Sequence, residues 1–149
     1  MQRGAASAYG LQQVLRNIIA SVQTFKIMIA PLTLNSLPLF PLHTVLFPGG
    51  HLPLRVFETR YRTMVRQCRE AGAPFGVVTL TQGHEVQTAD QTLERFHRFG
   101  TMASIDSLAS MHNGLEMLCC TGRERFTIHA SRKLPHGLWV ADVELLPPD

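Results

Sequence analysis

Histidines and cysteines are the residues of this chain whose side chains could hold a metal ion or act as nucleophiles. The histidines are His43, His51, His84, His97, His112, His129 and His136. No H-E-x-x-H motif or other metal-ligand spacing links them. Glu85 follows His84 and Glu94 lies near His97, but both pairs fall in a polar stretch that we expect to be a solvated loop. We therefore predict no metal ligand.

The cysteines are Cys68, Cys119 and Cys120, with no C-x-x-C motif and no histidine at zinc-finger spacing. Cys119 and Cys120 are adjacent, and adjacent residues of a strand point to opposite faces, so the two could share neither a metal ion nor a relaxed disulfide. We interpret all three as reduced, small hydrophobic residues. That interpretation fits a cytoplasmic setting.

Residues 1–30 form an N-terminal extension in which apolar residues recur at helical spacing from Leu11 to Phe25. The pattern predicts an amphipathic helix that packs on the domain or on a partner, so an oligomer could form through residues 11–25. Two other interpretations stay open. Translation could begin at Met28, which would make the upstream part foreign to the domain, or the segment could be an organellar targeting sequence.

Prolines are dense in residues 31–57. Because proline donates no hydrogen bond to a strand ladder, we expect short edge strands and turns there. The expected strand pieces are Leu37–Leu42, Thr44–Phe47 and Leu52–Phe57, with a turn at Pro48-Gly49-Gly50 after the second piece.

Residues 58–71 form the clearest predicted helix. Apolar residues from Tyr61 to Cys68 fall at i, i+3, i+4 and i+7, with arginines between them. Gly72 supplies the C-terminal stop and Pro74 prevents continuation.

Beyond the helix the hydrophobic period changes to two. Phe75–Leu80 is a continuous apolar run that predicts a central strand, and residues 82–98 are expected to form a long exposed loop. Turn signals at His112-Asn113-Gly114 and Pro135-His136-Gly137 then separate strands of alternating pattern. We therefore predict a mainly β (α+β) fold with one main helix, in which the C-terminal half is an antiparallel meander and the strands form a small, partly closed barrel.

The net charge of +3 over 149 residues is unevenly distributed. No acidic residue precedes Glu58, and the four basic residues before it account for the whole excess, because 10 basic and 11 acidic residues follow. Nucleic-acid binding would need basic residues clustered on the folded domain, so the charge pattern argues against a nucleic-acid partner. No apolar run reaches the roughly 18 residues of a membrane span.

Several short motifs follow one another in a fixed order between residues 36 and 146. They are Leu37-Pro38-Leu39-Phe40-Pro41-Leu42, Val45-Leu46-Phe47-Pro48-Gly49-Gly50, Leu52-Pro53-Leu54, Phe57-Glu58-Thr59-Arg60-Tyr61, Gly100-Thr101-Met102-Ala103 and Gly122-Arg123-Glu124-Arg125-Phe126. Together they resemble the N-terminal, substrate-binding domain of Lon proteases, in the stand-alone form that bacteria carry.

The resemblance implies a PUA-like pseudobarrel for residues 31–149. In full Lon proteases this domain helps to capture unfolded or tagged substrates and supports hexamer assembly, and a related domain is a scaffold in the ubiquitin-ligase receptor cereblon. Most members continue into a helical bundle. This chain stops at Pro147-Pro148-Asp149, so we expect a fragment or a reduced version without that bundle.

The motif residues are expected to be mainly structural, at turns and in the core. They are Pro38, Pro41, Pro48, Gly49, Pro53, Glu58, Tyr61, Gly100, Gly122, Arg125 and Phe126. Glu58 would lie near the helix start, where the helix dipole favours it, and could bond to an arginine of a neighbouring strand.

Phe40, Phe47, Leu52 and Arg60 are the candidate residues for binding a peptide or a partner. The first three lie on proline-broken strands whose unpaired edges an extended peptide could use by strand addition. The alternative is that they fill the core. Arg60 could form a ligand notch beside the barrel together with Glu58, or serve a structural role.

No catalytic residue or cofactor is predicted. Lon proteolysis needs an ATPase module and a Ser–Lys dyad, whereas this sequence has neither G-x-x-x-x-G-K-[ST] nor G-x-S-x-G. Lys26 and Lys133 are its lysines; the first lies outside the matched region and the second is expected to be exposed. A lysine base needs burial to lower its pKa.

The leading hypothesis is therefore a non-catalytic module that binds polypeptide substrates or a partner protein. The alternatives are an RNA- or small-ligand-binding barrel, by analogy with other PUA-like domains, and a structural subunit of a larger assembly. The sequence identifies neither the partner nor the oligomeric state.

Overall fold

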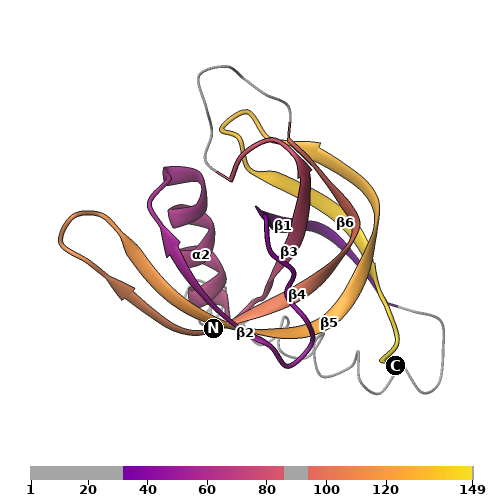
Figure 1. The fold of residues 1–149 in the computed structure, drawn as a ribbon, viewed down its shortest axis with the longest axis horizontal. Helices are drawn as coiled ribbons and strands as arrows, with labels where there is room; N and C mark the ends of the chain where they lie inside the picture. Colours follow the sequence, from indigo (N-terminus) through magenta and orange to yellow (C-terminus); the bar gives the residue numbers. More distant parts are fainter. Residues whose placement is uncertain (1–31, 86–93, 149) are drawn as a thin grey trace, which may run out of the picture.

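The computed structural model describes residues 32–85 and 94–148. In that part the chain is mainly β with one helix, which confirms the predicted fold class (Figure 1). The elements are β1 (Thr33–Leu42), β2 (His51–Val56), α2 (Thr59–Ala71), β3 (Phe75–Gln82), β4 (Arg95–Ser110), β5 (Glu116–Lys133) and β6 (Trp139–Leu145). The predicted amphipathic helix at 11–25 lies outside the described residues.

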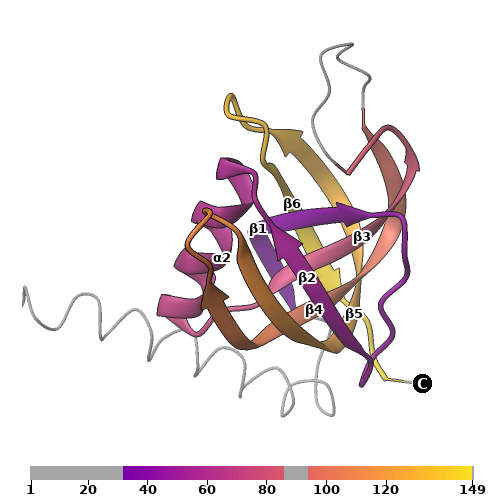
Figure 2. The same ribbon diagram turned by 60° about the vertical axis from the view of Figure 1, so that its left-hand side comes forward.

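The strands form one sheet in the order β2-β5-β4-β3-β1-β6, and an additional pairing of β6 with β5 closes it. The pair β1–β3 is parallel and the other pairs are antiparallel. Because the first half of β5 pairs with β2 and the second half with β6, β2 stands beside the closed barrel as an edge strand. Figures 1 and 2 show α2 on the same side of the barrel as β2.

The expectation of short edge strands in residues 31–57 is confirmed for β2 and wrong for β1. β1 lies between β6 and β3, pairing with β6 over residues 33–38 and with β3 over residues 39–42. At each point along such a strand, only one of its two edges is hydrogen-bonded to a neighbouring strand. Pro38 and Pro41 are compatible with such a strand, because a proline nitrogen can face the unpaired side.

The predicted strand piece Thr44–Phe47 and the predicted loop 82–98 both need correction. Residues 43–50 form a loop without strand hydrogen bonding in the described chain. The predicted loop 82–98 is too long, since β4 already begins at Arg95, where Phe96 pairs with Leu80 of β3. Both β4 and β5 are also longer than expected, with 16 and 18 residues, since they bend through register shifts to close the barrel.

The helix prediction is confirmed. α2 begins at Thr59 with Glu58 as its N-cap residue, and Gly72 is the C-cap, where the backbone N–H of Ala73 donates to the carbonyl of Cys68. Its buried face carries Tyr61, Met64, Val65 and Cys68, as the spacing indicated, and also Arg60.

The core has two parts. The larger cluster joins the buried face of α2 to β2, β3 and the first half of β5; the smaller one lies in the barrel around Phe126, which is 0% exposed. A Cβ atom at Gly100 would lie 2.4 Å from Cζ of Phe126, so a larger residue there would displace this ring. No helix in the described part of the chain is long and apolar enough to cross a membrane.

Candidate functional site

The loop of residues 43–50, between β1 and β2, lines one of two hollows on the surface. Its backbone is tied to the barrel at several points. The hydroxyl of Thr101 donates to the carbonyl of Leu46 at 2.7 Å, Gly49 N donates to Gly122 O at 2.9 Å, and Gly122 N donates to Gly50 O at 2.8 Å. The loop is therefore held in place although it belongs to no strand.

Gly122 of β5 is the position where this loop and the barrel approach most closely. A Cβ atom at Gly122 would lie 2.2 Å from the carbonyl oxygen of Phe47, a separation that no side chain can take. The motifs around Phe47-Pro48-Gly49, Gly100-Thr101 and Gly122, far apart in the sequence, thus meet at one junction. Their common role there is to let the loop lie against β4 and β5.

The first hollow is a small apolar surface that this loop presents. Val45, Phe47 and Phe99 are 56%, 68% and 50% exposed, and they surround a hollow of about 140 Å³. Val77, Gly100 and Thr101 also line it, and the exposed Arg125 lies at its edge. We call Val45, Phe47 and Phe99 the Phe47 surface.

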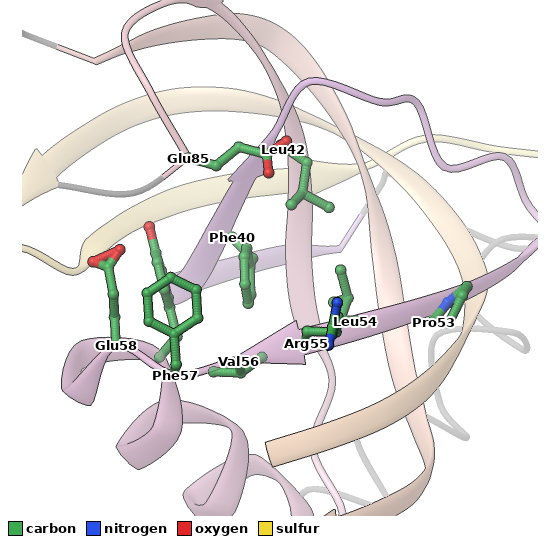
Figure 3. A pocket seen from close by; sticks show the side chains of 10 residues that line it. Phe40, Leu42, Pro53, Leu54, Arg55, Val56, Phe57, Glu58 and Glu85 are labelled. Carbon is green, nitrogen blue, oxygen red and sulfur yellow. The ribbon is translucent and has the colours of Figure 1, made fainter. Parts of the chain in front are cut away.

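The second hollow, the α2 cavity, lies between the end of β1, the edge strand β2 and the start of α2, and measures about 280 Å³. Figure 3 shows Phe57 and Glu58 at the α2 end, Leu54 and Val56 along β2, and Glu85 entering from the opposite side. Its ten lining residues are Phe40, Leu42, Pro53, Leu54, Arg55, Val56, Phe57, Glu58, Tyr61 and Glu85.

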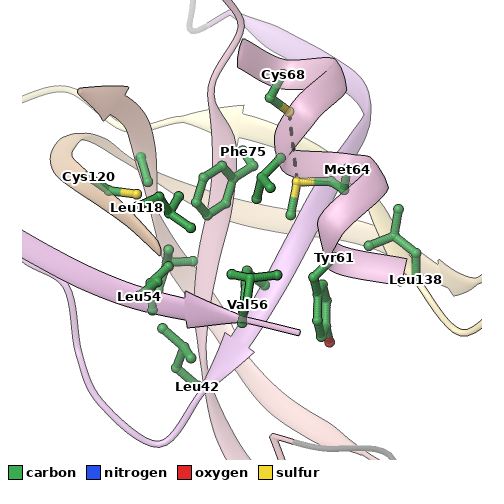
Figure 4. Close-up of a cluster of buried hydrophobic side chains, with 14 of the residues drawn as sticks. Leu42, Leu54, Val56, Tyr61, Met64, Cys68, Phe75, Leu118, Cys120 and Leu138 are labelled. Atoms are coloured by element: carbon green, nitrogen blue, oxygen red, sulfur yellow. Dashed lines mark hydrogen bonds between the residues drawn. The ribbon is translucent and has the colours of Figure 1, made fainter. Parts of the chain in front are cut away.

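An aromatic stack forms the inner wall of the α2 cavity. The rings of Phe40 and Tyr61 are nearly parallel with centroids 4.2 Å apart, and Phe75 lies 6.1 Å from Phe40. Figure 4 shows Tyr61 beside Val56 within the larger core cluster. Burial raises the pKa of the Tyr61 hydroxyl well above its usual range. Tyr61 therefore stays protonated.

A buried ion network holds the start of α2 against the barrel. Arg60 Nε lies 3.1 Å from Glu58 Oε2, and one terminal nitrogen of Arg60 lies 3.4 Å from Glu94 and 2.7 Å from the carbonyl of Gly137. Lys133 Nζ lies 2.6 Å from Glu94. Burial alone would lower the pKa of Arg60, but Tyr61, Glu58 and Glu94 outweigh it and the pKa is raised.

A second ion pair fixes α2 to the β4–β5 hairpin. Glu116 is 1% exposed and bonds to Arg66 of α2 and to the hydroxyl of Ser110, the latter at 2.6 Å. The hydrogen bond from Ser110, with the charge of Arg66, lowers the pKa of this carboxylate. Ion pairs therefore hold the helix to the barrel at its start, through Arg60, and at its middle, through Arg66.

The four candidate residues from the sequence fall in different places. Phe47 is the most exposed member of the Phe47 surface, whereas Phe40 is 5% exposed and lines the α2 cavity. Leu52 is half-buried against the larger core cluster. Arg60 is 5% exposed and is engaged by the ion network. They do not form one site.

The motif residues expected to be structural lie at turns, on strands and in the core. Pro48 and Gly49 form the turn of the 43–50 loop, Pro53 lies on edge strand β2, and Tyr61 and Phe126 are buried. Glu58, the N-cap residue of α2, bonds to Arg60.

Several residues of both hollows were missed at the level of sequence. Phe99 follows the predicted loop 82–98 and has no predicted role, although the strand signal of Gly100-Thr101 extends back to it. Phe57 was quoted in a motif but not proposed for a role. Glu94 was expected to be solvated and is 5% exposed, and nothing in the local sequence signals its partners Arg60 and Lys133.

The described residues contain no group of three or more histidine, cysteine, aspartate or glutamate side chains that could hold a metal ion. Cys68 and Cys120 are buried and Cys119 is exposed, all with free thiols, so the adjacent Cys119 and Cys120 lie on opposite faces of β5 as expected. Burial raises the pKa of Cys68 to about 11 and that of Cys120 to about 12.

Comparison with known proteins gives consistent results. A family model described as the ATP-dependent protease La (LON) substrate-binding domain matches residues 36–149. The chain is 30% identical over 117 residues to protein cereblon of Xenopus tropicalis, covering 76% of this chain and 24% of that protein. It is 30% identical over 94 residues to Lon protease of Flavobacterium johnsoniae, covering 62% of this chain and 11% of that protein. The chain thus spans only a minor part of either relative.

Solved structures show the same likeness. The Lon N-terminal domain protein from Xanthomonas campestris has a TM-score of 0.64 and 36% identity, with 78% of this chain and 62% of that chain covered. The N-terminal domain of Mycobacterium avium complex Lon protease has a TM-score of 0.51 and 18% identity, with 76% and 56% covered, a likeness in fold alone.

Proposed function

This chain belongs to the family of Lon substrate-binding domains, and from that membership we propose that it binds polypeptide through the Phe47 surface without catalysing a reaction. Membership of this family supports a role for the chain as a substrate-recognition module. The bound polypeptide would present apolar side chains, as unfolded segments do.

The observation that carries this proposal is the exposure of Val45, Phe47 and Phe99 around one hollow. Single exposed apolar residues are normal on protein surfaces, but a group of them around a concavity is typical of an interaction site. Phe47 dominates because a large aromatic side chain buries much apolar area at a low cost in conformational entropy.

The hydrogen bonds that fix the 43–50 loop to the barrel support the same proposal. The carbonyl of Leu46 accepts a hydrogen bond from Thr101, and Gly49 and Gly50 are hydrogen-bonded to Gly122. A pre-ordered loop loses little entropy on binding, so more of the apolar contact energy appears as affinity.

The non-catalytic part of the proposal rests on the lysines and the missing motifs. Lys133 forms an ion pair with Glu94, with Nζ 2.6 Å from the carboxylate, so its amine is engaged in a structural contact. Lys26 lies outside the described residues. We also propose a cytoplasmic location, supported by the three free thiols.

The experiment is fluorescence anisotropy of labelled, unfolded casein titrated with the wild-type chain and with Phe47→Ala. We expect Phe47→Ala to weaken binding by about fivefold to tenfold, the loss typical of an aromatic anchor. Because the side chain is 68% exposed, its removal should leave the folded state intact, which circular dichroism would check.

Met111→Ala is the matched control. Met111 is 45% exposed and lies between β4 and β5, outside the Phe47 surface. Equal affinities of all three proteins for casein, or equal losses in both variants, would contradict the proposed site.

A further inference from the structure

The α2 cavity combines aromatic walls with carboxylates at its edge. Phe40 and Tyr61 form the inner wall, and Phe57, 56% exposed, stands at the opening. Glu58 and Glu85 line the same space, together with Arg55. At about 280 Å³ the cavity is at the lower end of ligand pockets, which span about 300–1,000 Å³. It therefore suits one side chain rather than a larger molecule.

The hydroxyl of Tyr61 is the most informative group in this cavity. Tyr61 is 3% exposed, and its hydroxyl oxygen has no hydrogen-bond partner among the residues that the structure describes. A buried polar atom without a partner costs free energy that a bound group would recover. One ring face is stacked on Phe40 and Arg60 lies over the ring at 4.5 Å, so the two faces are occupied. The ring edge that carries the hydroxyl is therefore the part of Tyr61 that a ligand could contact.

The lining of the cavity carries two carboxylates, Glu58 and Glu85, against one cation, Arg55, so its charge balance favours a bound cation. The guanidinium of Arg60 is already engaged by Glu58, Glu94 and the carbonyl of Gly137. Glu85 accepts one hydrogen bond at Oε2, from the backbone N–H of His43 at 2.7 Å, and a carboxylate can accept several. The negative potential of Glu58 and Glu85 also acts on Tyr61, which marks them as near neighbours of its ring.

We propose that the α2 cavity binds an arginine side chain of a polypeptide. Its aliphatic stem would lie along Leu54 and Val56, and its guanidinium would stack on Phe57 and donate hydrogen bonds to Glu85 and to the hydroxyl of Tyr61. A guanidinium matches this set because it is planar, always charged and carries several donors, so it stacks on a ring and bonds in its own plane. The site is separate from the Phe47 surface and does not depend on it.

The experiment is a titration of the isotope-labelled full chain with Nα-acetyl-L-arginine methylamide, followed by NMR chemical shifts. The citrulline analogue has nearly the same shape without the charge, and the norleucine analogue has only the apolar stem. We expect shifts for residues that line the cavity and an affinity for the arginine probe about fivefold or more above that for citrulline. Arginine as the free amino acid distinguishes a free ligand from a peptide side chain.

Two variants locate the contact without disturbing the ion network. Tyr61→Phe removes only the hydroxyl and Glu85→Gln only a charge, and each should weaken binding of the arginine probe by about threefold to fivefold. Phe47→Ala should leave this titration unchanged while it weakens casein binding, so the two proposals fail independently.

The proposal is overturned by equal binding of the arginine and citrulline probes, or by shifts outside the cavity only. It is also overturned if neither Tyr61→Phe nor Glu85→Gln changes the affinity. Free arginine that binds more tightly than the blocked probe would replace the polypeptide by a small cationic ligand.

Discussion

The Phe47 surface and the α2 cavity are lined by different residues, and they are held by different forces. The side chains of the Phe47 surface are half exposed or more, and backbone hydrogen bonds and a close approach at Gly122 fix the loop that carries them. The inner wall of the α2 cavity is buried, and the ion network around Arg60 fixes it.

A substitution in the Phe47 surface can therefore change binding with little change in stability, whereas a substitution in the wall of the α2 cavity can change both. Trimming an exposed side chain such as Phe47 removes a contact for a partner and little packing. Phe40 and Tyr61 belong both to the cavity wall and to the larger core cluster. A change at the cavity therefore has to be tested for stability before it is interpreted as a change in binding.

Arg60→Ala is expected to have the largest effect and to act on the α2 cavity. Removing this 5% exposed side chain breaks the ion pairs of Arg60 with Glu58 and Glu94, and the pair of Glu94 with Lys133 remains. Breaking a buried ion pair from one side should lower the free energy of unfolding by about 3 kcal/mol. Urea denaturation measures this, and the alkylation rate of Cys68 reports the opening of α2.

Arg132→Ala is the control for Arg60. Arg132 is 53% exposed and lies 3.9 Å from Asp142, so its removal should cost less than about 1 kcal/mol. Similar losses in both variants would show that the network around Arg60 contributes no more than a surface pair. Casein binding by the folded fraction of Arg60→Ala should remain, since the Phe47 surface is held independently.

Gly122→Ala is the second test and acts on the other region. Its Cβ atom would meet the backbone oxygen of Phe47, so the loop must move away from β5. We expect a loss of about 2 kcal/mol in the free energy of unfolding and weaker casein binding. Ala109→Val adds bulk at an exposed position of β4 and should change neither quantity. Unchanged casein binding in folded Gly122→Ala would mean that the loop position is unimportant.

Tyr61→Phe should have the smallest effect at neutral pH, within about 0.5 kcal/mol, because the hydroxyl has no partner to lose. The effect of this substitution on stability appears at alkaline pH. The folded state keeps the Tyr61 proton to a higher pH than the unfolded chain, whose tyrosine titrates near 10.0. The unfolded state is therefore favoured as pH rises through 10, and wild-type stability falls more steeply there than that of the variant. Parallel stability curves from pH 8 to about pH 11 would contradict the burial of this group.

The sequence predicted most of the elements and little of how they meet. The helical spacing from Tyr61 to Cys68 identified α2 because periodicity is a local property. Proline density suggested an edge for β1, but its partners β3 and β6 come from later in the chain. Phe47 was proposed from its motif and is exposed, whereas Phe40 was proposed on the same argument and is buried.

By itself, then, the sequence determined the fold class, the family and the positions of helix and turns, since motifs and periods are written along the chain. The tertiary structure alone decided that Arg60 reaches Glu94 and Gly137, and that Gly122 lies against the loop of Phe47. It also decided which aromatic side chains face a hollow. Such contacts join residues that barrel closure brings together, and their strength depends on burial and distance, neither of which is a property of the local sequence.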